Sequence, residues 1–306
     1  MAINPVDLTA QRILITGATG FVAAPLVAAL AKQNTVFAAA RFSDESQRDK
    51  IEALGAIPVV LDLAADEWQD LPENIDYVIN MAVAKSGKWE LDLRINAQGL
   101  GRLMLHYQDV KGFLHISSTA VYEYAGHEPR CEDSALGDNH RNLFETYSIS
   151  KIAAETVAQF TAKAFNIPLT VARLNVPYGP FACWPYFHLL MMQNKLPIDI
   201  HPKGPNGYSP IHSDDIIAKI PYLLAAANAD TEIVNLAGDE VVSIEQWCAY
   251  MSELTGLTPQ FNKTEKALGN LSCDTTKLKS LSGASQVDWK DGIKAMIATM
   301  AADALL

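Results

Sequence analysis

The stretch Thr16–Ala23, which reads Thr-Gly-Ala-Thr-Gly-Phe-Val-Ala, constrains the fold of this chain more than any other. It follows the apolar run Arg12–Ile15 and precedes an alanine- and leucine-rich segment, a pattern that predicts a strand, a glycine turn and a helix. In such a unit Gly17 allows the tight turn, Gly20 lets the backbone approach a pyrophosphate, and the first helical turn points its free N–H groups at that anion. Ala23 stands where a third glycine is usual. Two glycines can also make a simple turn, but the strand before them and the helix after them favour a dinucleotide site.

The composition is that of a folded protein with a large core and no general affinity for polyanions. Of 306 residues, 49% are hydrophobic and only 19% are charged, which is enough apolar material for one or two domains. The net charge of −11 argues against binding to nucleic acid or to anionic membranes. We therefore expect a small-molecule ligand and no nucleic-acid partner.

The cysteines and the N-terminus give further expectations about location and metals. The four cysteines are widely scattered and lack metal-ligand spacing, so that we expect reduced thiols and no metal site. The N-terminus has no export signal, and no apolar run approaches the length of a membrane span. These features predict a cytoplasmic protein without a membrane partner.

The first part of the chain alternates short aliphatic runs with longer helical patterns. This alternation predicts an α/β fold, a doubly wound parallel Rossmann sheet covered by helices on both faces. The expected strands lie near 12–16, 35–40, 57–61, 76–81, 112–117 and 168–174, and the expected helices near 20–32, 44–54, 91–108 and 145–165.

Beyond Pro177 the residue composition changes, since prolines, glycines and aromatic residues cluster there. This composition predicts an irregular lobe over a binding cleft. A helix near 212–226 and a strand near 232–236 return to the sheet in this interpretation, while 243–255 and 288–303 form helices of the smaller lobe. The predicted division is a dinucleotide-binding domain at 1–176 with 212–236 returning to it, and a C-terminal substrate-binding lobe at 177–211 and 237–306.

A tyrosine and a lysine with helical spacing suggest the chemistry. Tyr147 and Lys151 lie four residues apart, which puts a phenol and an ammonium on one face of a helix. The spacing alone proves little, since Tyr107 and Lys111 repeat it. However, Tyr147 opens a long helix about 30 residues after a serine pair at a strand's carboxyl end, where open parallel sheets bind their ligands.

Taken together, the motifs resemble the extended short-chain dehydrogenase/reductase family of the NAD(P)-dependent epimerase/dehydratase type. The resemblance covers nearly the whole chain and rests on the order and spacing of six motifs. These are Gly17–Phe21, Ser117-Ser118 with Val121-Tyr122, Tyr147 with Lys151, Arg173 ahead of Tyr178-Gly179-Pro180, Ile211–Asp215, and Asn235–Gly238.

The resemblance implies that Tyr147 is the general acid/base and that Lys151 lowers its pKa and holds the ribose hydroxyls of a nicotinamide dinucleotide. Ser118 would orient the substrate oxygen, with Ser117 as the near rival and strand-end capping as the alternative for both serines. The resemblance also implies a homodimer formed by packed helices.

The cofactor preference depends on the end of the second strand, where Arg41 stands in place of the acidic residue that grips the 2′-hydroxyl of NAD. A guanidinium pairs well with a 2′-phosphate, so NADP is preferred and NAD remains possible. Asp44 follows closely, and a solvated strand-end charge is the alternative. The expected cofactor-binding residues are Gly17, Thr19, Gly20, Phe21, Val22, Arg41, Asp62, Leu63, Met81, Ala82, Val83, Tyr147, Lys151, Asn175 and Val176. Asp62 is equally plausible as a helix cap, and Asn96 resembles a family position behind the active site.

The substrate is indicated mainly by what the chain lacks. No arginine follows Arg173, whereas family members that act on nucleotide sugars usually clamp the diphosphate with arginines of the lobe. Thr119 and Ala120 replace the acid pair of the sugar dehydratases, and the asparagine of the strand exit, Asn175, lies one residue early. An aromatic run in the lobe could bind an apolar substrate, or it could form lobe core or a dimer contact. The candidate substrate residues, with the catalytic serine, are Ser118, Tyr178, Trp184, Phe187 and His188.

The sequence thus predicts an NADP-preferring oxidoreductase that moves hydride between the cofactor and the carbonyl or secondary alcohol of a small, non-nucleotide substrate. An alternative is a sugar or nucleotide-sugar epimerase that uses bound NAD for transient oxidation. A second alternative is a non-catalytic, nucleotide-sensing protein of the same fold, against which Ser118, Tyr147 and Lys151 argue.

Overall fold

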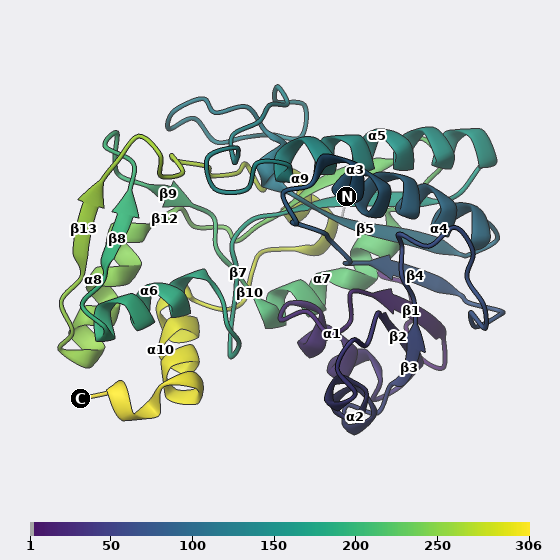
Figure 1. Cartoon of the computed structure of the whole chain (residues 1–306), viewed down its shortest axis with the longest axis horizontal. Helices are drawn as coiled ribbons and strands as arrows, with labels where there is room; N and C mark the ends of the chain where they lie inside the picture. The colour runs from purple at the N-terminus through teal and green to yellow at the C-terminus, as the bar shows by residue number, and fades with distance from the viewer. Residues whose placement is uncertain (1–2) are drawn as a thin grey trace.

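Seven parallel strands form the central sheet of the computed structural model, which describes residues 3–306. Their order is β11-β6-β5-β4-β1-β2-β3, the doubly wound arrangement that the sequence predicts (Figure 1). The strands are β1 (Arg12–Thr16), β2 (Thr35–Ala40), β3 (Ile57–Val60), β4 (Tyr77–Asn80), β5 (Gly112–Ser118), β6 (Leu169–Leu174) and β11 (Glu232–Leu236). The expected α/β Rossmann fold is confirmed.

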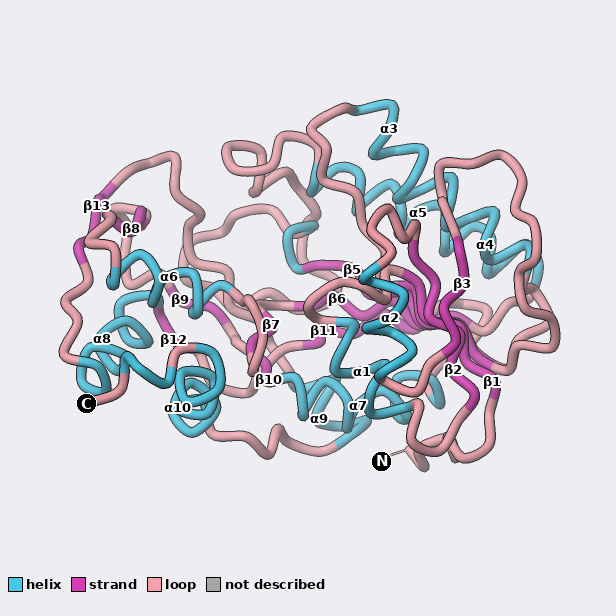
Figure 2. The backbone as a smooth tube through the Cα atoms, turned by 60° about the horizontal axis from the view of Figure 1, so that its bottom comes forward, coloured by secondary structure: helices cyan, strands magenta, loops and turns pink. Residues whose placement is uncertain are grey.

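Helices cover both faces of the sheet because the strands are apolar on both sides. In β1, Ile13 and Ile15 belong to one core cluster and Leu14 to the other, as the alternation along a strand requires. One face is covered by α1 (Ala23–Leu30), α2 (Ser46–Ala53), α7 (Ser213–Ala225) and α9 (Thr276–Ser282). The other is covered by the π-helix η1 (Arg94–Gly99), α4 (Leu100–His106) and α5 (Tyr147–Phe165), with α3 (Trp89–Leu93) leading into η1. In Figure 1, α3, α4 and α5 lie above the sheet and α1, α2 and α7 below it, and Figure 2 shows α9 beside α7.

The lobe beside the sheet has its own core. Trp247 is fully buried there among Leu189, Met251 and Met296, which come from three helices of the lobe. Its helices are α6 (Trp184–Gln193), α8 (Ile244–Thr255) and α10 (Trp289–Met300). Short strand pairs complete it: β7 (Pro177–Tyr178) with β10 (Ile211–His212), β9 (Gly207–Tyr208) with β12 (Val242–Ser243), and β8 (Pro197–Ile200) with β13 (Gln260–Lys263). The lobe lies at one end of the molecule in Figure 2.

Two segments differ from the expectation. The predicted helix at 91–108 consists of α3, the π-helical turn η1 and α4, because a wider turn is inserted before Leu100. The segment 177–211 is less irregular than predicted, since residues 184–193 form the regular helix α6. Pro185 stands in the first turn of α6, where its missing N–H costs no helical hydrogen bond.

The carboxyl ends of the strands meet at one edge of the sheet, which positions the site. Thr16 is in register with both Ala39 and Asn80, and Ser118 is in register with Leu174. Loops that leave these strands therefore meet above the same edge, as ligand-binding loops of open parallel sheets do. Among the helices of residues 3–306, none has the length and apolar character that a membrane span requires.

Candidate active site

A cleft of about 240 Å³ runs along the carboxyl edge of the sheet at the glycine turn after β1. Its lining brings together residues from four separate loops, and most of the predicted cofactor residues are among them: Gly17, Thr19, Gly20, Arg41, Asp62, Leu63, Met81, Ala82 and Val83. Phe21 lies beside this group with 61% of its surface exposed, and Val22 forms the N-cap of α1 and packs against the core.

The glycine turn fits a dinucleotide because it leaves no room for side chains. Gly17 has φ +66°, and a Cβ there would lie 2.7 Å from the backbone of Ala82. A Cβ on Gly20 would lie 3.1 Å from the carbonyl oxygen of Gly17. The hydroxyl of Thr16 accepts a hydrogen bond from the Ala82 N–H and donates one to Asn80, at 3.2 and 2.6 Å. Two strand ends are thereby held together, and the backbone of the turn faces the cleft where a pyrophosphate would bind.

Arg41 and Asp62 face the cleft from neighbouring strand ends. The Asp62 carboxylate accepts a hydrogen bond from the Ala64 N–H, so Asp62 both lines the cleft and caps a turn. Asp44 accepts hydrogen bonds from the N–H and hydroxyl of Ser46 at the start of α2. Within residues 3–306, Arg41 forms no ion pair with any carboxylate, so its guanidinium is available to a ligand.

Tyr147 and Ser118 meet next to this cleft. Tyr147 is the first residue of α5, and Ser118 is the last residue of β5. Burial raises the pKa of Tyr147, and hydrogen bonding to the Ser118 hydroxyl lowers it in part. Without a further positive charge Tyr147 is therefore a neutral phenol at pH 7, able to donate a proton.

Lys151 lies one turn along α5 from Tyr147 and is only 3% exposed. Its ammonium donates a hydrogen bond to the carbonyl oxygen of Ile116 in β5, at 2.9 Å. Burial lowers the pKa of Lys151 to about 8, with Glu155 raising it and Lys85 lowering it. A buried ammonium is thus held between the catalytic helix and the strand that carries Ser118.

The two serines of β5 have different surroundings because successive side chains of a strand point to opposite faces. The Ser117 hydroxyl donates a 2.6 Å hydrogen bond to Glu155, which also forms a buried ion pair with Arg173 at 2.7 Å. The Ser118 hydroxyl accepts a bond from the Ala120 N–H in the 3₁₀ turn η2 (Thr119–Val121), and its other contact is Tyr147 instead of a buried carboxylate. This difference favours Ser118 as the residue that touches substrate.

Asp92 was missed by sequence reasoning, and it supports the site together with Asn96. Asp92 is fully buried and accepts hydrogen bonds from Ser86 and from the Thr146 hydroxyl, the latter at 2.5 Å. Asn96, one turn further, bonds to both backbone groups of Ala84 and donates to the Ser150 hydroxyl. The four-residue spacing of Asp92 and Asn96, matched by that of Thr146 and Ser150, was the available signal.

The second tyrosine–lysine pair has no part in the site. Tyr107 is buried and donates a hydrogen bond to the carbonyl oxygen of Pro72 at 3.1 Å. Lys111 forms an ion pair with Asp76 at 2.8 Å. Both groups are satisfied by structural contacts, so that context and not spacing distinguishes the two pairs.

Asn175 and Val176 are not among the residues that line the cleft. The amide nitrogen of Asn175 donates to the Thr119 hydroxyl and to the Leu271 carbonyl, both at 2.9 Å. Its oxygen accepts a hydrogen bond from the Ser209 N–H at 3.0 Å. With both donor hydrogens used internally, Asn175 ties the sheet to the lobe, and a contact with nicotinamide finds no support in this geometry.

The candidate substrate residues of the lobe have packing roles. His188 is buried, and its Nδ1 accepts a hydrogen bond from the Trp247 indole at 2.9 Å. Trp184 packs edge-on against Tyr208 in the same cluster. Tyr178 is also buried, while Phe187 is 47% exposed on α6. The lobe-core alternative therefore accounts for the buried part of this run.

A second cavity, of about 240 Å³, lies near Tyr147 on the lobe side. It is lined by His140, whose ring centroid is 5.9 Å from that of Tyr147, and by Tyr124, His201 and Glu265 among other residues. Burial lowers the pKa of His140 to about 4, so that this imidazole is neutral at pH 7. No lysine or arginine is among its lining residues. Sequence reasoning had no periodic signal for this cavity, because its walls come from loops.

The fold is that of a Rossmann-type protein, and comparison with known proteins agrees. The family profile described as NAD dependent epimerase/dehydratase family matches residues 13–237. The chain therefore belongs to this family, and the expected resemblance is confirmed. It is an enzyme of the extended short-chain dehydrogenase/reductase type.

Curated relatives of similar sequence are nucleotide-sugar enzymes. A trifunctional UDP-glucose 4,6-dehydratase/UDP-4-keto-6-deoxy-D-glucose 3,5-epimerase/UDP-4-keto-L-rhamnose-reductase of Arabidopsis thaliana is 25% identical, over 93% of this chain and 46% of its own length. A dTDP-D-glucose 4,6-dehydratase of Dictyostelium discoideum is 26% identical, over 72% of this chain and 57% of its own length. The chain thus spans about half the length of these relatives.

Solved structures share the fold at low identity. The UDP-glucuronic acid 4-epimerase of Bacillus cereus, in complex with UDP-glucuronic acid and NAD, superimposes with a TM-score of 0.79 at 21% identity. The match covers 94% of this chain and 98% of that one. These findings favour the epimerase alternative over the expected non-nucleotide substrate, and they do not confirm a preference for NADP.

Proposed function

We propose that this chain uses NAD to oxidise a secondary alcohol of a sugar-type substrate transiently, and that the net reaction is epimerisation. The observation that carries the proposal is the meeting of Tyr147, Ser118 and buried Lys151 beside a cleft lined by the glycine turn. The nucleotide-sugar enzymes among its relatives support a substrate of that class.

The surroundings of Tyr147, Ser118 and Lys151 give each residue a different role in the proposed reaction. Tyr147 removes the proton of the substrate hydroxyl as the base and returns it as the acid. The Ser118 hydroxyl holds the same oxygen, because it lies against Tyr147 and is not bonded to a buried carboxylate. Within the protein the Ser118 hydroxyl lowers the pKa of Tyr147 against the effect of burial. The buried ammonium of Lys151, one helical turn away, supplies the positive charge that favours the phenolate when ligands are bound. Bound NAD would supply the hydride acceptor and donor, held by the glycine turn, Asp62 and Met81–Val83.

Dehydration is disfavoured by the residues that follow Ser118. The hydroxyl of Thr119 accepts a hydrogen bond from the Asn175 amide at 2.9 Å, and Ala120 is buried without a polar group. Neither residue can act as the acid or base that removes water from a sugar.

The second candidate function is an NADP-dependent oxidoreductase of a non-nucleotide carbonyl or alcohol. Two observations favour it: Arg41 faces the cofactor cleft without an ion pair, and no arginine follows Arg173. Tyr208, which lies just before the Ile211–Asp215 motif, is buried against Trp184 and Trp247. A diphosphate would therefore bind here without bidentate guanidinium donors.

We also propose a cytoplasmic homodimer that packs through the helices of one face of the sheet. Phe160 and Phe165 of α5 are 73% and 50% exposed, and Leu105 of α4 is 41% exposed. Apolar side chains on two adjacent helices are typical of a contact surface.

Purified enzyme incubated with UDP-glucose, with UDP-glucuronic acid and with a panel of small carbonyls tests the function. Epimerisation predicts that NAD copurifies and that a sugar product forms without net change in nicotinamide absorbance. Net consumption of NADPH with a small carbonyl would favour the second candidate instead. Tyr147→Phe should lower kcat by about 10²- to 10⁴-fold, while Tyr107→Phe, its matched control, should keep full activity.

A further inference from the structure

A third cavity, of about 260 Å³, lies where the lobe joins the sheet, between the start of α7, the loop after β11 and the segment before α10. It shares no lining residue with the cofactor cleft or with the cavity beside Tyr147.

Two polar atoms in its wall are buried and unsatisfied. His212 is 6% exposed, and its Nε2 has no hydrogen-bond partner within residues 3–306, nor has the Ser285 hydroxyl. The Nδ1 of His212 accepts a hydrogen bond from the Asp214 N–H, which leaves the ring proton on Nε2. Burial lowers the pKa of His212, so the ring is neutral at pH 7. A buried N–H without an acceptor costs free energy that a ligand oxygen would recover.

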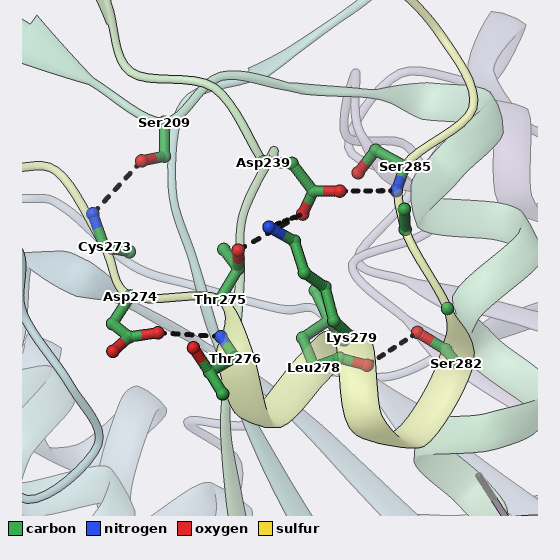
Figure 3. A network of polar contacts seen from close by, with 12 residues as sticks. Ser209, Asp239, Cys273, Asp274, Thr275, Thr276, Leu278, Lys279, Ser282 and Ser285 are labelled. Carbon is green, nitrogen blue, oxygen red and sulfur yellow. Dashed lines mark hydrogen bonds and ion pairs between the residues drawn. The ribbon is translucent and has the colours of Figure 1, made fainter.

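Carboxylates dominate the rest of the wall. Asp215 and Asp239 accept backbone N–H groups of residues 285–287, which fixes their oxygens around the cavity. Figure 3 shows Asp239 between the Ser285 N–H and the Thr275 hydroxyl, with Lys279 beside it. The other two acidic groups of the wall are Glu240 and Asp288.

The charge of these carboxylates is only partly balanced. Lys279 lies 3.6 Å from Asp239, and Lys219 is directed to the Ser282 hydroxyl and the Gly283 carbonyl. In the described part of the chain, neither Glu240 nor Asp288 has an ion-pair partner. Residues 3–306 contain no group of three or more His, Cys, Asp or Glu side chains placed to hold a metal ion. Glu240 and Asp288 are exposed, and Asp288 also accepts the N–H groups of Lys290 and Asp291 as the N-cap of α10. The unpaired negative charge at the mouth of the cavity favours a ligand with a cationic group.

We propose that this cavity binds a small hydroxylated primary amine, of the amino-sugar or amino-alcohol class. The ammonium group lies against Glu240 and Asp288, and a hydroxyl oxygen accepts the Nε2–H of His212 and bonds to Ser285. The ring of Trp289 closes one side and offers an apolar face. The proposal does not depend on the function of the Tyr147 site.

Calorimetric titration of the NAD-loaded enzyme with D-glucosamine tests the site, with D-glucose as the neutral probe of the same shape. Glucosamine should bind one site per chain, and glucose at least tenfold more weakly. Glu240→Gln and Ser285→Ala should each weaken glucosamine binding about tenfold, and both keep the His212 cap of α7 intact. Glu253→Gln, which removes an exposed carboxylate of α8 away from the cavity, should change nothing.

Tyr147→Phe separates this site from the catalytic one, because glucosamine binding should be unchanged in that variant. Three outcomes overturn the proposal: no glucosamine binding up to about 10 mM, equal binding of glucose and glucosamine, or full affinity in both Glu240→Gln and Ser285→Ala. Loss of binding in Tyr147→Phe would assign the amine to the active site and would also overturn it.

Discussion

The hydroxyl of Thr146 donates a 2.5 Å hydrogen bond to the buried carboxylate of Asp92. Thr146 directly precedes Tyr147, and Asp92 also holds the N–H groups of Ser86 and Gly87 in the loop after β4. One carboxylate thus joins a loop at the edge of the cofactor cleft to the start of the catalytic helix. Because these bonds fix the start of α5, we expect Asp92 to act as a positioning residue for Tyr147.

Asp92→Asn should lower kcat about tenfold, equal to about 1.4 kcal/mol, with a smaller change in cofactor affinity. The reason is that an amide cannot accept all of the hydrogen bonds that orient Thr146 and the loop. We also expect a loss of about 1–3 kcal/mol in the free energy of unfolding. Steady-state kinetics and urea unfolding measure the two effects, and Asp109→Asn, an exposed carboxylate of the loop after α4, is the control.

The acid dependence of stability gives an independent readout of Asp92. Burial raises the pKa of Asp92, but hydrogen bonds from Thr146, Ser86 and Gly87 outweigh it, so that the pKa is lowered overall. The charged form therefore contributes stability above the unfolded pKa of about 4, which is lost as the pH falls through the folded value. Asp92→Asn should flatten this part of the stability profile, and an unchanged profile would contradict the assignment.

Ser117→Ala should mainly lower the stability of the protein, whereas Ser118→Ala should mainly lower kcat. Ser117→Ala removes a buried hydrogen bond to Glu155 and should cost about 1.5–3 kcal/mol of stability, while kcat falls less than about threefold. Ser118→Ala should lower kcat about 100-fold and cost less than about 1 kcal/mol. Thermal unfolding and kinetics on both variants test this, and a reversed pattern would make Ser117 the substrate-binding serine.

Lys151→Met should inactivate the enzyme and stabilise the cofactor-free protein. The folded pKa of Lys151 is lowered to about 8 mainly by burial, so the charged form is penalised in the folded state below that pH. The penalty is relieved as the pH rises from about 8 to the unfolded value of about 10.4. We expect Lys151→Met to be about 1–3 kcal/mol more stable at pH 7, with the difference shrinking near pH 10. A variant less stable than the parent at pH 7 would show that the bond to Ile116 outweighs the burial of the charge.

Arg41→Ala tests the cofactor preference. If Arg41 reads a 2′-phosphate, this variant should bind NADPH at least about tenfold more weakly and leave NADH affinity unchanged. Arg48→Ala is the matched control, because Arg48 lies nearby on α2 and stacks over Phe42 outside the cleft lining. Cofactor fluorescence titration gives both affinities. If the parent binds NADH tenfold more tightly than NADPH, Arg41 has no role in the choice.

Local sequence patterns were sufficient for the sheet and for the cofactor cleft. Gly17 and Gly20 follow β1 within a contiguous strand–turn–helix unit, and the residues after β2, β3 and β4 face the same cleft because parallel strands end together. Sequence patterns did not predict the contacts of a residue that bonds to two segments far apart in the chain. The helical spacing of Asp92 and Asn96 could not reveal the partners Ser86 and Thr146, because these partners depend on tertiary contact.

In the lobe, too, the sequence pattern could not reveal which distant residues would come into contact. Its aromatic run suggested a substrate surface, but His188 pairs with Trp247, 59 positions away, and becomes core. The cavity beside Tyr147 and the one at His212 are both walled by loops whose approach no periodicity encodes.

The sequence by itself determined the order of strands and helices, the glycine turn, and the Tyr147–Lys151 pair, because each depends on residues within a few turns of one another. Only the tertiary structure decided that Ser117 bonds to Glu155 while Ser118 meets Tyr147, that Lys151 is buried, and that Asn175 uses its amide in internal hydrogen bonds. These properties depend on which distant groups satisfy a polar atom, and that is fixed only when the sheet, α5 and the lobe pack together.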